Sequence, residues 1–160
     1  METNKHWIQS ENDVKLVTKP WGSRSLNDTQ GLGEMWLNYA HSELVGEQEK
    51  RYVFKKLYIK AGTKTSLQYH VHKDETNHLI SGDALALMEN ERGEMEESPF
   101  TVGDSWTIPC GRKHRLIALT DLIMLEASSP EVDDVVRIQD DAGRGSGRIE
   151  SEHTARVTQP

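Results

Sequence analysis

Apolar and polar residues alternate along many short segments of this chain, which predicts β-strands. Between residues 51 and 59, Val53, Leu57 and Ile59 share one face with a single charged residue, Lys55, as in a strand packed on a core. Similar short segments recur at 14–17, 66–72, 79–80, 84–88, 106–108, 116–119 and 122–127. Since turn residues separate them and no long apolar stripe of helical period occurs, the pattern predicts an all-β barrel or jelly roll.

The length of 160 residues indicates a single domain with a substantial core. We expect an N-terminal arm at 1–13, the barrel at 14–141, and a flexible tail rich in Gly, Arg, Ser and Glu at 142–160. The stretch 27–50 is interpreted as an insertion, a hairpin or short helix centred on residues 35–39. It would either cap the barrel mouth or form a surface excursion.

Charge and composition restrict the partners. The net charge of -7 argues against nucleic acid and anionic membranes, because phosphate binding needs a basic excess. The chain has no apolar run long enough to cross a bilayer and no signal-peptide pattern at its first residues. Its one cysteine, Cys110, cannot form an internal disulfide, which fits a reducing compartment. A cytoplasmic protein is therefore expected.

Histidines and a glutamate gather in two segments. His70 and His72 lie two residues apart, so both imidazoles would leave the same face if 66–72 is extended. Glu75 would join them only if the chain turns or bulges between, and His114 follows a Pro-x-Gly turn. Three imidazoles and one carboxylate predict a single divalent transition metal, with zinc as first choice and manganese, iron, nickel or cobalt as alternatives.

At these positions the sequence resembles the cupin superfamily, whose fold is a jelly-roll β-barrel (double-stranded β-helix). Its first motif is matched by Gly62, His70, His72, Glu75 and Gly82, and its second by Gly103, Pro109, Gly111 and His114. The first motif has two extra residues after its first glycine and one fewer before Glu75, and Ala118 stands where the second usually has Asn. The resemblance implies that His70, His72, Glu75 and His114 are the metal ligands.

Five further segments narrow the resemblance to one family. They are Lys19-Pro-Trp-Gly22, 54–62, Ser66-Leu-Gln-Tyr-His70, 108–116 and 133–144. All are similar to segments of the mannose-6-phosphate isomerase domain at the C-terminal end of type II phosphomannose isomerase / mannose-1-phosphate guanylyltransferase enzymes. Two departures concern the substrate. Lys73 replaces an Arg, which loses the guanidinium fork that grips phosphate, and Thr76-Asn77 replaces His-Trp. The nucleotidyltransferase domain of those enzymes has no counterpart here.

The resemblance implies a metal-dependent isomerase that interconverts mannose 6-phosphate and fructose 6-phosphate. Glu126 would then be the catalytic base or, alternatively, a group that orients a ligand histidine. Lys73 is assigned to catalysis and phosphate contact, Arg115 to phosphate contact, and Gln68 to a sugar hydroxyl. Arg137 and Arg144 are expected in structural ion pairs with Asp133, Asp134 or Asp140.

Two other functions stay open at this point. Other cupins use three histidines and a glutamate around iron for dioxygenase chemistry, and the same barrel also serves as a non-catalytic module that binds a carbohydrate or another small molecule. Because cupin barrels expose sheet edges, which subunits can cover by pairing strands, we expect a homodimer.

Overall fold

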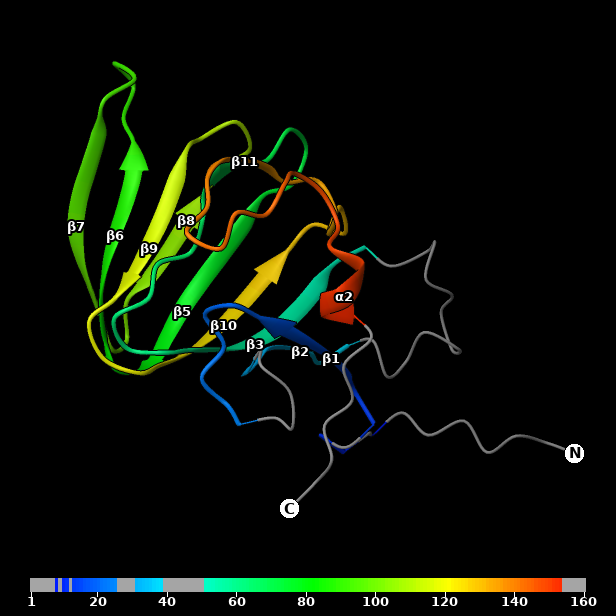
Figure 1. Cartoon of the computed structure of the whole chain (residues 1–160). Coiled ribbons are helices and arrows are strands. Elements are labelled where there is room, and N and C mark those ends of the chain that lie inside the picture. The colour runs from blue at the N-terminus through cyan, green and yellow to red at the C-terminus, as the bar shows by residue number, and fades with distance from the viewer. Residues whose placement is uncertain (1–7, 9, 12, 26–30, 39–50, 154–160) are drawn as a thin grey trace, which may run out of the picture.

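The computed structural model describes residues 8, 10, 11, 13–25, 31–38 and 51–153. These residues form two antiparallel β-sheets and one short helix, α2 (Glu150–His153) (Figure 1). The fold is an all-β cupin barrel, as the sequence predicted. Among the described residues, no helix has the length and apolar character needed to span a bilayer.

Each sheet combines strands that are distant in sequence. In order across the six-stranded sheet lie β1 (Lys15–Lys19), β2 (Gly31–Trp36), β3 (Val53–Ile59), β10 (Leu122–Ser128), β5 (Glu75–Ser81) and β8 (Ser105–Ile108). The five-stranded sheet contains β11 (Val136–Gln139), β4 (Leu67–Tyr69), β9 (His114–Ala118), β6 (Asp83–Glu89) and β7 (Met95–Thr101).

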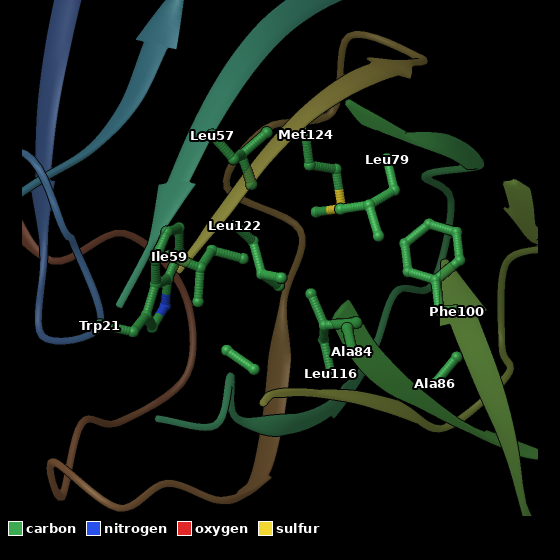
Figure 2. Close-up of a cluster of buried hydrophobic side chains, with 11 residues drawn as sticks. Trp21, Leu57, Ile59, Leu79, Ala84, Ala86, Phe100, Leu116, Leu122 and Met124 are labelled. Carbon is green, nitrogen blue, oxygen red and sulfur yellow. The ribbon is translucent and has the colours of Figure 1, made fainter. Parts of the chain in front are cut away.

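Alternation along the strands places the core between the two sheets. In β3 the side chains of Val53, Lys55, Leu57 and Ile59 are buried, and the residues between them are more exposed. Figure 2 shows the apolar part of this interior, to which both sheets contribute. Its members are Trp21, Leu57, Ile59, Leu79, Ala84, Ala86, Phe100, Leu116, Ala118, Leu122 and Met124.

The turn between β5 and β6 requires glycine. Gly82 has φ +97°, and a Cβ there would lie 2.2 Å from the carbonyl oxygen of Asp121. A side chain is therefore excluded both by the backbone conformation and by the closely packed neighbouring turn. This turn ends the first of the two motifs and directs the chain from one sheet to the other.

Part of the stretch interpreted as an insertion is instead a sheet strand. Residues 31–36 form β2, which pairs with β1 on one side and β3 on the other. All five residues from Leu32 to Trp36 are buried, because β2 has a neighbour on each edge and the C-terminal helix close by. The expected cap or surface excursion was wrong for β2, and residues 27–30 and 39–50 lie outside the described part.

The tail expected to be flexible is packed against the barrel as far as His153. It runs from β11, at the edge of one sheet, to α2 against β1, at the edge of the other (Figure 1). Glu152 is only 1% exposed and pairs with Lys19 at 2.8 Å and with Arg144 at 3.1 Å. We call residues 142–153 the C-terminal strap. Composition did not predict its order, since the pair with Lys19 joins residues 133 positions apart in the sequence.

Candidate metal centre and cavity

Two histidines and one glutamate from three parts of the fold meet in a cavity between the sheets. His70 follows β4, Glu75 begins β5 and His114 begins β9, and all three are buried. Oε1 of Glu75 lies 3.2 Å from Nε2 of His70 and 3.1 Å from Nε2 of His114. A metal bound at about 2.1 Å by three such ligands would separate them by roughly 3.0–3.4 Å, so the spacing suits one transition-metal ion.

Hydrogen bonding at the far side of each ring determines which nitrogen faces Glu75. Nδ1 of His70 contacts the carbonyl oxygen of Asp134 at 2.5 Å, and Nδ1 of His114 contacts that of Arg112 at 2.9 Å. A carbonyl oxygen only accepts, so both Nδ1 atoms carry a proton and the Nε2 atom of each ring faces the carboxylate of Glu75. Histidines bound to metals are commonly held in this way, with one ring nitrogen on a carbonyl oxygen and the other free to bind the ion.

His72 lies outside this group, so the prediction that it shares a strand face with His70 was wrong. Strand β4 ends at Tyr69, and the chain turns at residues 71–72, leaving His72 exposed. The carboxylate of Asp134 stabilises this turn by accepting the N–H groups of Val71, His72 and Lys73 at 3.1, 2.6 and 3.0 Å. The same turn brings Lys73 and Glu75 to the interior, as the expected bulge before Glu75 required.

A chain of buried charges adjoins the three candidate ligands. Nζ of Lys73 lies 3.8 Å from Glu75 and 3.4 Å from Glu126, while Nζ of Lys55 lies 3.7 Å from Glu126 and 3.1 Å from Glu34. All five side chains are at most 10% exposed and line the cavity. Two lysines thus alternate with three carboxylates, which lets each buried charge find an opposite one.

The two central carboxyl groups differ in their pKa. Burial raises the pKa of Glu126 to about 7, with the negative charge of Glu75 acting in the same direction and Lys73 against it. Burial also opposes ionisation of Glu75, but the Lys73 ammonium and the adjoining histidines outweigh it and hold the pKa of Glu75 well below its usual range. Adjacent carboxyls with separated pKa values can serve as ligand and proton carrier respectively.

Of the two residues assigned only to substrate binding, Gln68 lines the cavity and Arg115 does not. Gln68 lines the cavity with His70, as their spacing of two residues predicted, and accepts a hydrogen bond from Ser66. Arg115 is not among the residues that line the cavity, because it points to the face of β9 opposite His114 and Leu116. It donates to the carbonyl oxygen of Thr65 and pairs with Asp141 at 2.7 Å, so its prediction as a phosphate contact was wrong.

The expected ion pair of Arg144 is present, and that of Arg137 is absent from the described residues. Arg144 pairs with Asp140 at 2.9 Å and also with Glu152. Arg137 instead donates to the carbonyl oxygens of Gly145 and Gly147. Both guanidinium groups belong to residues that line the cavity.

Several cavity residues were not predicted. Glu34, Lys55 and Asn77 all line it, and two of them carried a signal: Lys55 is the charged residue on the apolar face of β3, and Asn77 follows Glu75 by two residues on β5. Three buried side-chain polar atoms have no hydrogen-bond partner within the described chain, namely Asn77 Oδ1, Arg137 Nε and His153 Nδ1. All three belong to residues that line this cavity, which indicates a polar ligand.

The comparisons with solved structures agree with the fold. The chain superimposes on CapF, in its crystal structure with the inhibitor 3-isopropenyl-tropolone, with a TM-score of 0.57 and 16% identity over 79% of this chain and 35% of that one. The oxalate decarboxylase of Lactobacillus farciminis gives a TM-score of 0.51 and 21% identity over 61% of this chain and 29% of the other. At these identities the similarity concerns the fold alone.

Comparison with known sequences identifies the family, in addition to the fold. The alginate biosynthesis protein AlgA of Pseudomonas aeruginosa is 29% identical over an alignment 140 residues long, which covers 82% of this chain and 27% of AlgA. The chain therefore spans about a quarter of the length of that relative. The family model described as mannose-6-phosphate isomerase C-terminal matches residues 33–140, from β2 to the end of β11. The chain belongs to the mannose-6-phosphate isomerase C-terminal family of cupins.

Proposed function

We propose that this protein is a metal-dependent aldose–ketose isomerase that acts on a sugar phosphate of the mannose 6-phosphate type. The position of Glu126 carries the proposal: its buried carboxylate shares a cavity with the three ligands and lies 3.4 Å from the Lys73 ammonium. Aldose–ketose isomerisation needs a group that moves a proton between neighbouring carbons and a cation beside the oxygen that gains charge. Membership of the family supports a sugar phosphate as substrate.

Glu126 and Lys73 would have separate roles in the reaction, one in proton transfer and the other in stabilising charge. Glu126 takes the proton from C2 of the open-chain aldose and returns it to C1, while the hydroxyl proton on O2 passes to O1, which converts the aldehyde into the ketose through an enediol. Lys73 donates a hydrogen bond to the oxygen that gains negative charge and keeps Glu126 in place. A carboxyl group with a pKa of about 7 can accept and return a proton near neutral pH.

The metal would be held by His70, Glu75 and His114, with zinc as first choice and manganese, iron, nickel or cobalt as alternatives. When bound, it would supply Lewis acidity to the carbonyl oxygen of the substrate. Gln68 and Asn77 line the same cavity, and the unpartnered Oδ1 of Asn77 is suited to accept a hydrogen bond from a sugar hydroxyl.

Turnover of mannose 6-phosphate to fructose 6-phosphate tests the proposal. Protein stripped with a chelator and reloaded in parallel with zinc, manganese, cobalt, nickel or iron(II) should recover activity with at least one metal. His114→Ala should abolish the activity, while His72→Ala, which changes an exposed histidine in the same motif, should keep it. Absence of turnover with every metal, despite one bound ion per chain, would refute the proposal for this substrate.

Iron-dependent dioxygenase chemistry is a second candidate, favoured by the ligand set itself. With His72 outside the group, the ligands are two histidines and one carboxylate, which is also the set found in non-haem iron(II) oxygenases. Activity confined to the iron(II)-loaded protein, with consumption of oxygen, would support this function over the isomerase.

We further propose a homodimer. Strands β1 and β8 are the edges of one sheet and β11 and β7 those of the other, and Ile138 on β11 is 47% exposed. Pairing between copies would cover such edges. Sedimentation equilibrium at micromolar concentration distinguishes a dimer from a monomer.

A further inference from the structure

One positively charged side chain in the cavity, that of Arg137, lacks among the described residues the carboxylate partner that the others have. The other lysines and arginines that line the cavity each have a carboxylate within ion-pair distance; they are Lys19, Lys55, Lys73, Arg144 and Arg148. Arg137 also lines the cavity, but no carboxylate of the described residues lies within that distance, and its Nε is buried without a hydrogen-bond partner. The guanidinium therefore has both charge and hydrogen-bonding capacity left for a ligand.

Arg137 is held in place through its other nitrogen. Nη1 donates to the carbonyl oxygens of Gly145 and Gly147 in the C-terminal strap, the latter at 2.9 Å. Both acceptors are neutral, and the carboxylates of Glu152, Asp140 and Glu34 act on the guanidinium only from beyond ion-pair distance. Burial, and next the neighbouring guanidinium of Arg144, lower the pKa of Arg137, and these carboxylates offset the effect in part, so an anion beside Arg137 would stabilise its charge further.

The sheet register connects Arg137 to the ligand group. Arg137 on β11 lies opposite Gln68 on β4, and Gln68 lies opposite His114 on β9. Directly opposed residues share a face of the sheet, and all three side chains line the cavity. Two strand spacings of about 4.8 Å place the Arg137 backbone roughly 10 Å from that of His114. A ligand bound at the metal group by one end can therefore reach Arg137 with its other end.

We propose that Arg137 binds the phosphate group of the substrate, at the side of the cavity formed by the C-terminal strap. This inference rests on the proposed function for the sugar, but the anion site itself does not depend on turnover. A planar guanidinium suits phosphate because it donates two parallel hydrogen bonds. In this chain the guanidinium of Arg137 would supply the paired hydrogen bonds to phosphate that are lost at position 73, where Lys73 stands in place of the family's arginine.

Binding of inorganic phosphate to the chelator-treated protein, measured by calorimetry, tests the anion site without metal or turnover. We expect Arg137→Met to weaken binding at least tenfold and Arg137→Lys to weaken it less, since lysine keeps the charge without the fork. Arg148→Met is the matched control: Arg148 also lines the cavity but pairs with Glu150 at 2.7 Å, and its loss should change binding less than twofold. Equal affinity in wild type and Arg137→Met, or no binding by either, would overturn the inference.

Two further comparisons separate phosphate binding from a structural role. Ser146 accepts the main-chain N–H of Arg137 at 3.0 Å, so Ser146→Ala disturbs the strap without removing the guanidinium and should leave phosphate affinity within threefold. In the metal-loaded protein, Arg137→Met should lower the affinity for mannose 6-phosphate but leave the affinity for mannose unchanged. An equal loss of affinity for both sugars would show that Arg137 only supports the strap. Loss of phosphate binding in Arg137→Met without any isomerase activity in wild type would uphold this inference and refute the proposed function.

Discussion

Asp134 joins the loop that carries His70 to the closing segment of the chain. Its carboxylate accepts three successive main-chain N–H groups, from Val71 to Lys73, and its carbonyl oxygen fixes the ring of His70. Burial slightly opposes the charge, yet these donors hold the pKa of Asp134 below its usual value. The position of His70 thus depends on a residue 64 positions away in sequence.

We predict that Asp134→Ala lowers metal affinity by about 10-fold, the lower end of the usual cost of disturbing the groups around a ligand, since the main-chain carbonyl that contacts His70 remains. The loop at 71–73 would lose its main anchor, although His70, Glu75 and His114 remain. Competition with a fluorescent chelator measures the affinity. Asp133→Ala, which removes an exposed neighbouring carboxylate, is the control and should bind metal as the wild type does. Equal affinities in both variants would contradict this role of Asp134.

Lys55 illustrates how a buried charge depends on its neighbours. It is 4% exposed and lies between Glu34 and Glu126. Burial works against ionisation of Glu34, but Lys55, with help from Lys19, holds the pKa of Glu34 far below its usual range. Removing Lys55 would leave the buried Glu34 without a lysine at ion-pair distance among the described residues, and Glu126 with Lys73 alone.

Lys55→Met should therefore reduce the free energy of unfolding by about 3–5 kcal/mol, as expected when one partner of a buried pair is lost. Urea unfolding followed by tryptophan fluorescence measures the change. Lys56→Met on the same strand should cost less than about 1 kcal/mol, because its partner Glu11 is largely exposed. A cost for Lys55→Met as small as that of Lys56→Met would show that the buried pairs contribute little.

At the scale of elements, local pattern predicted the strands that alternate clearly and missed those defined by distant partners. β3, β6 and β10 were expected nearly at their observed bounds, since their apolar faces are local properties. β4 was expected to reach residue 72 and stops at Tyr69, because Asp134 diverts the chain. β2, β11 and the C-terminal strap carry weak local signals, and their order depends on pairing with distant segments.

The C-terminal strap should open when Glu152 is changed. Glu152→Ala removes both buried ion pairs that hold α2, so we expect trypsin to cut after Arg144 and Arg148 at least about tenfold faster than in wild type. Mass spectrometry of the fragments over time gives the two rates. Glu150→Ala, which removes a carboxylate that is 77% exposed, serves as the control. Equal cleavage of the two variants would refute this role of Glu152.

The strap also predicts a dependence of stability on pH. Burial, and then the charges of Lys15, Arg148 and Lys19, lower the pKa of His153 to about 4, with Glu34 opposing them, and its ring packs edge-on against Trp36. Between pH 6.5 and 4 the unfolded chain therefore binds a proton at this position that the folded chain does not, which destabilises the fold as the pH falls.

His153→Phe keeps the aromatic contact and removes the titration. We expect the variant to lose less stability than wild type between pH 7 and pH 4, and the two to respond alike between pH 7 and pH 8. Thermal unfolding across this range measures both. Parallel losses over the whole range would show that His153 does not contribute to the pH dependence.

At the scale of the whole molecule, the two sheets divide the interior into an apolar part and a polar part. The candidate metal ligands come from both sheets, with Glu75 on one and His114 and the loop residue His70 on the other. Motif spacing was sufficient to pick out these three as a group, since each lies at a strand end or directly after one. It could not exclude His72 or reveal Glu34 and Arg137, whose positions depend on the loop at 71–73, on β2 and on the register of β11.

The proposed activity requires a single metal ion held by His70, Glu75 and His114. Metal content by mass spectrometry, with X-ray absorption of the bound ion, tests it most directly in wild type, His70→Ala, His114→Ala and His72→Ala. We predict about one ion per chain with two imidazole ligands in wild type and in His72→Ala, and loss of most metal in the other two variants. Metal retained in His70→Ala and His114→Ala, or lost in His72→Ala, would contradict the proposed centre.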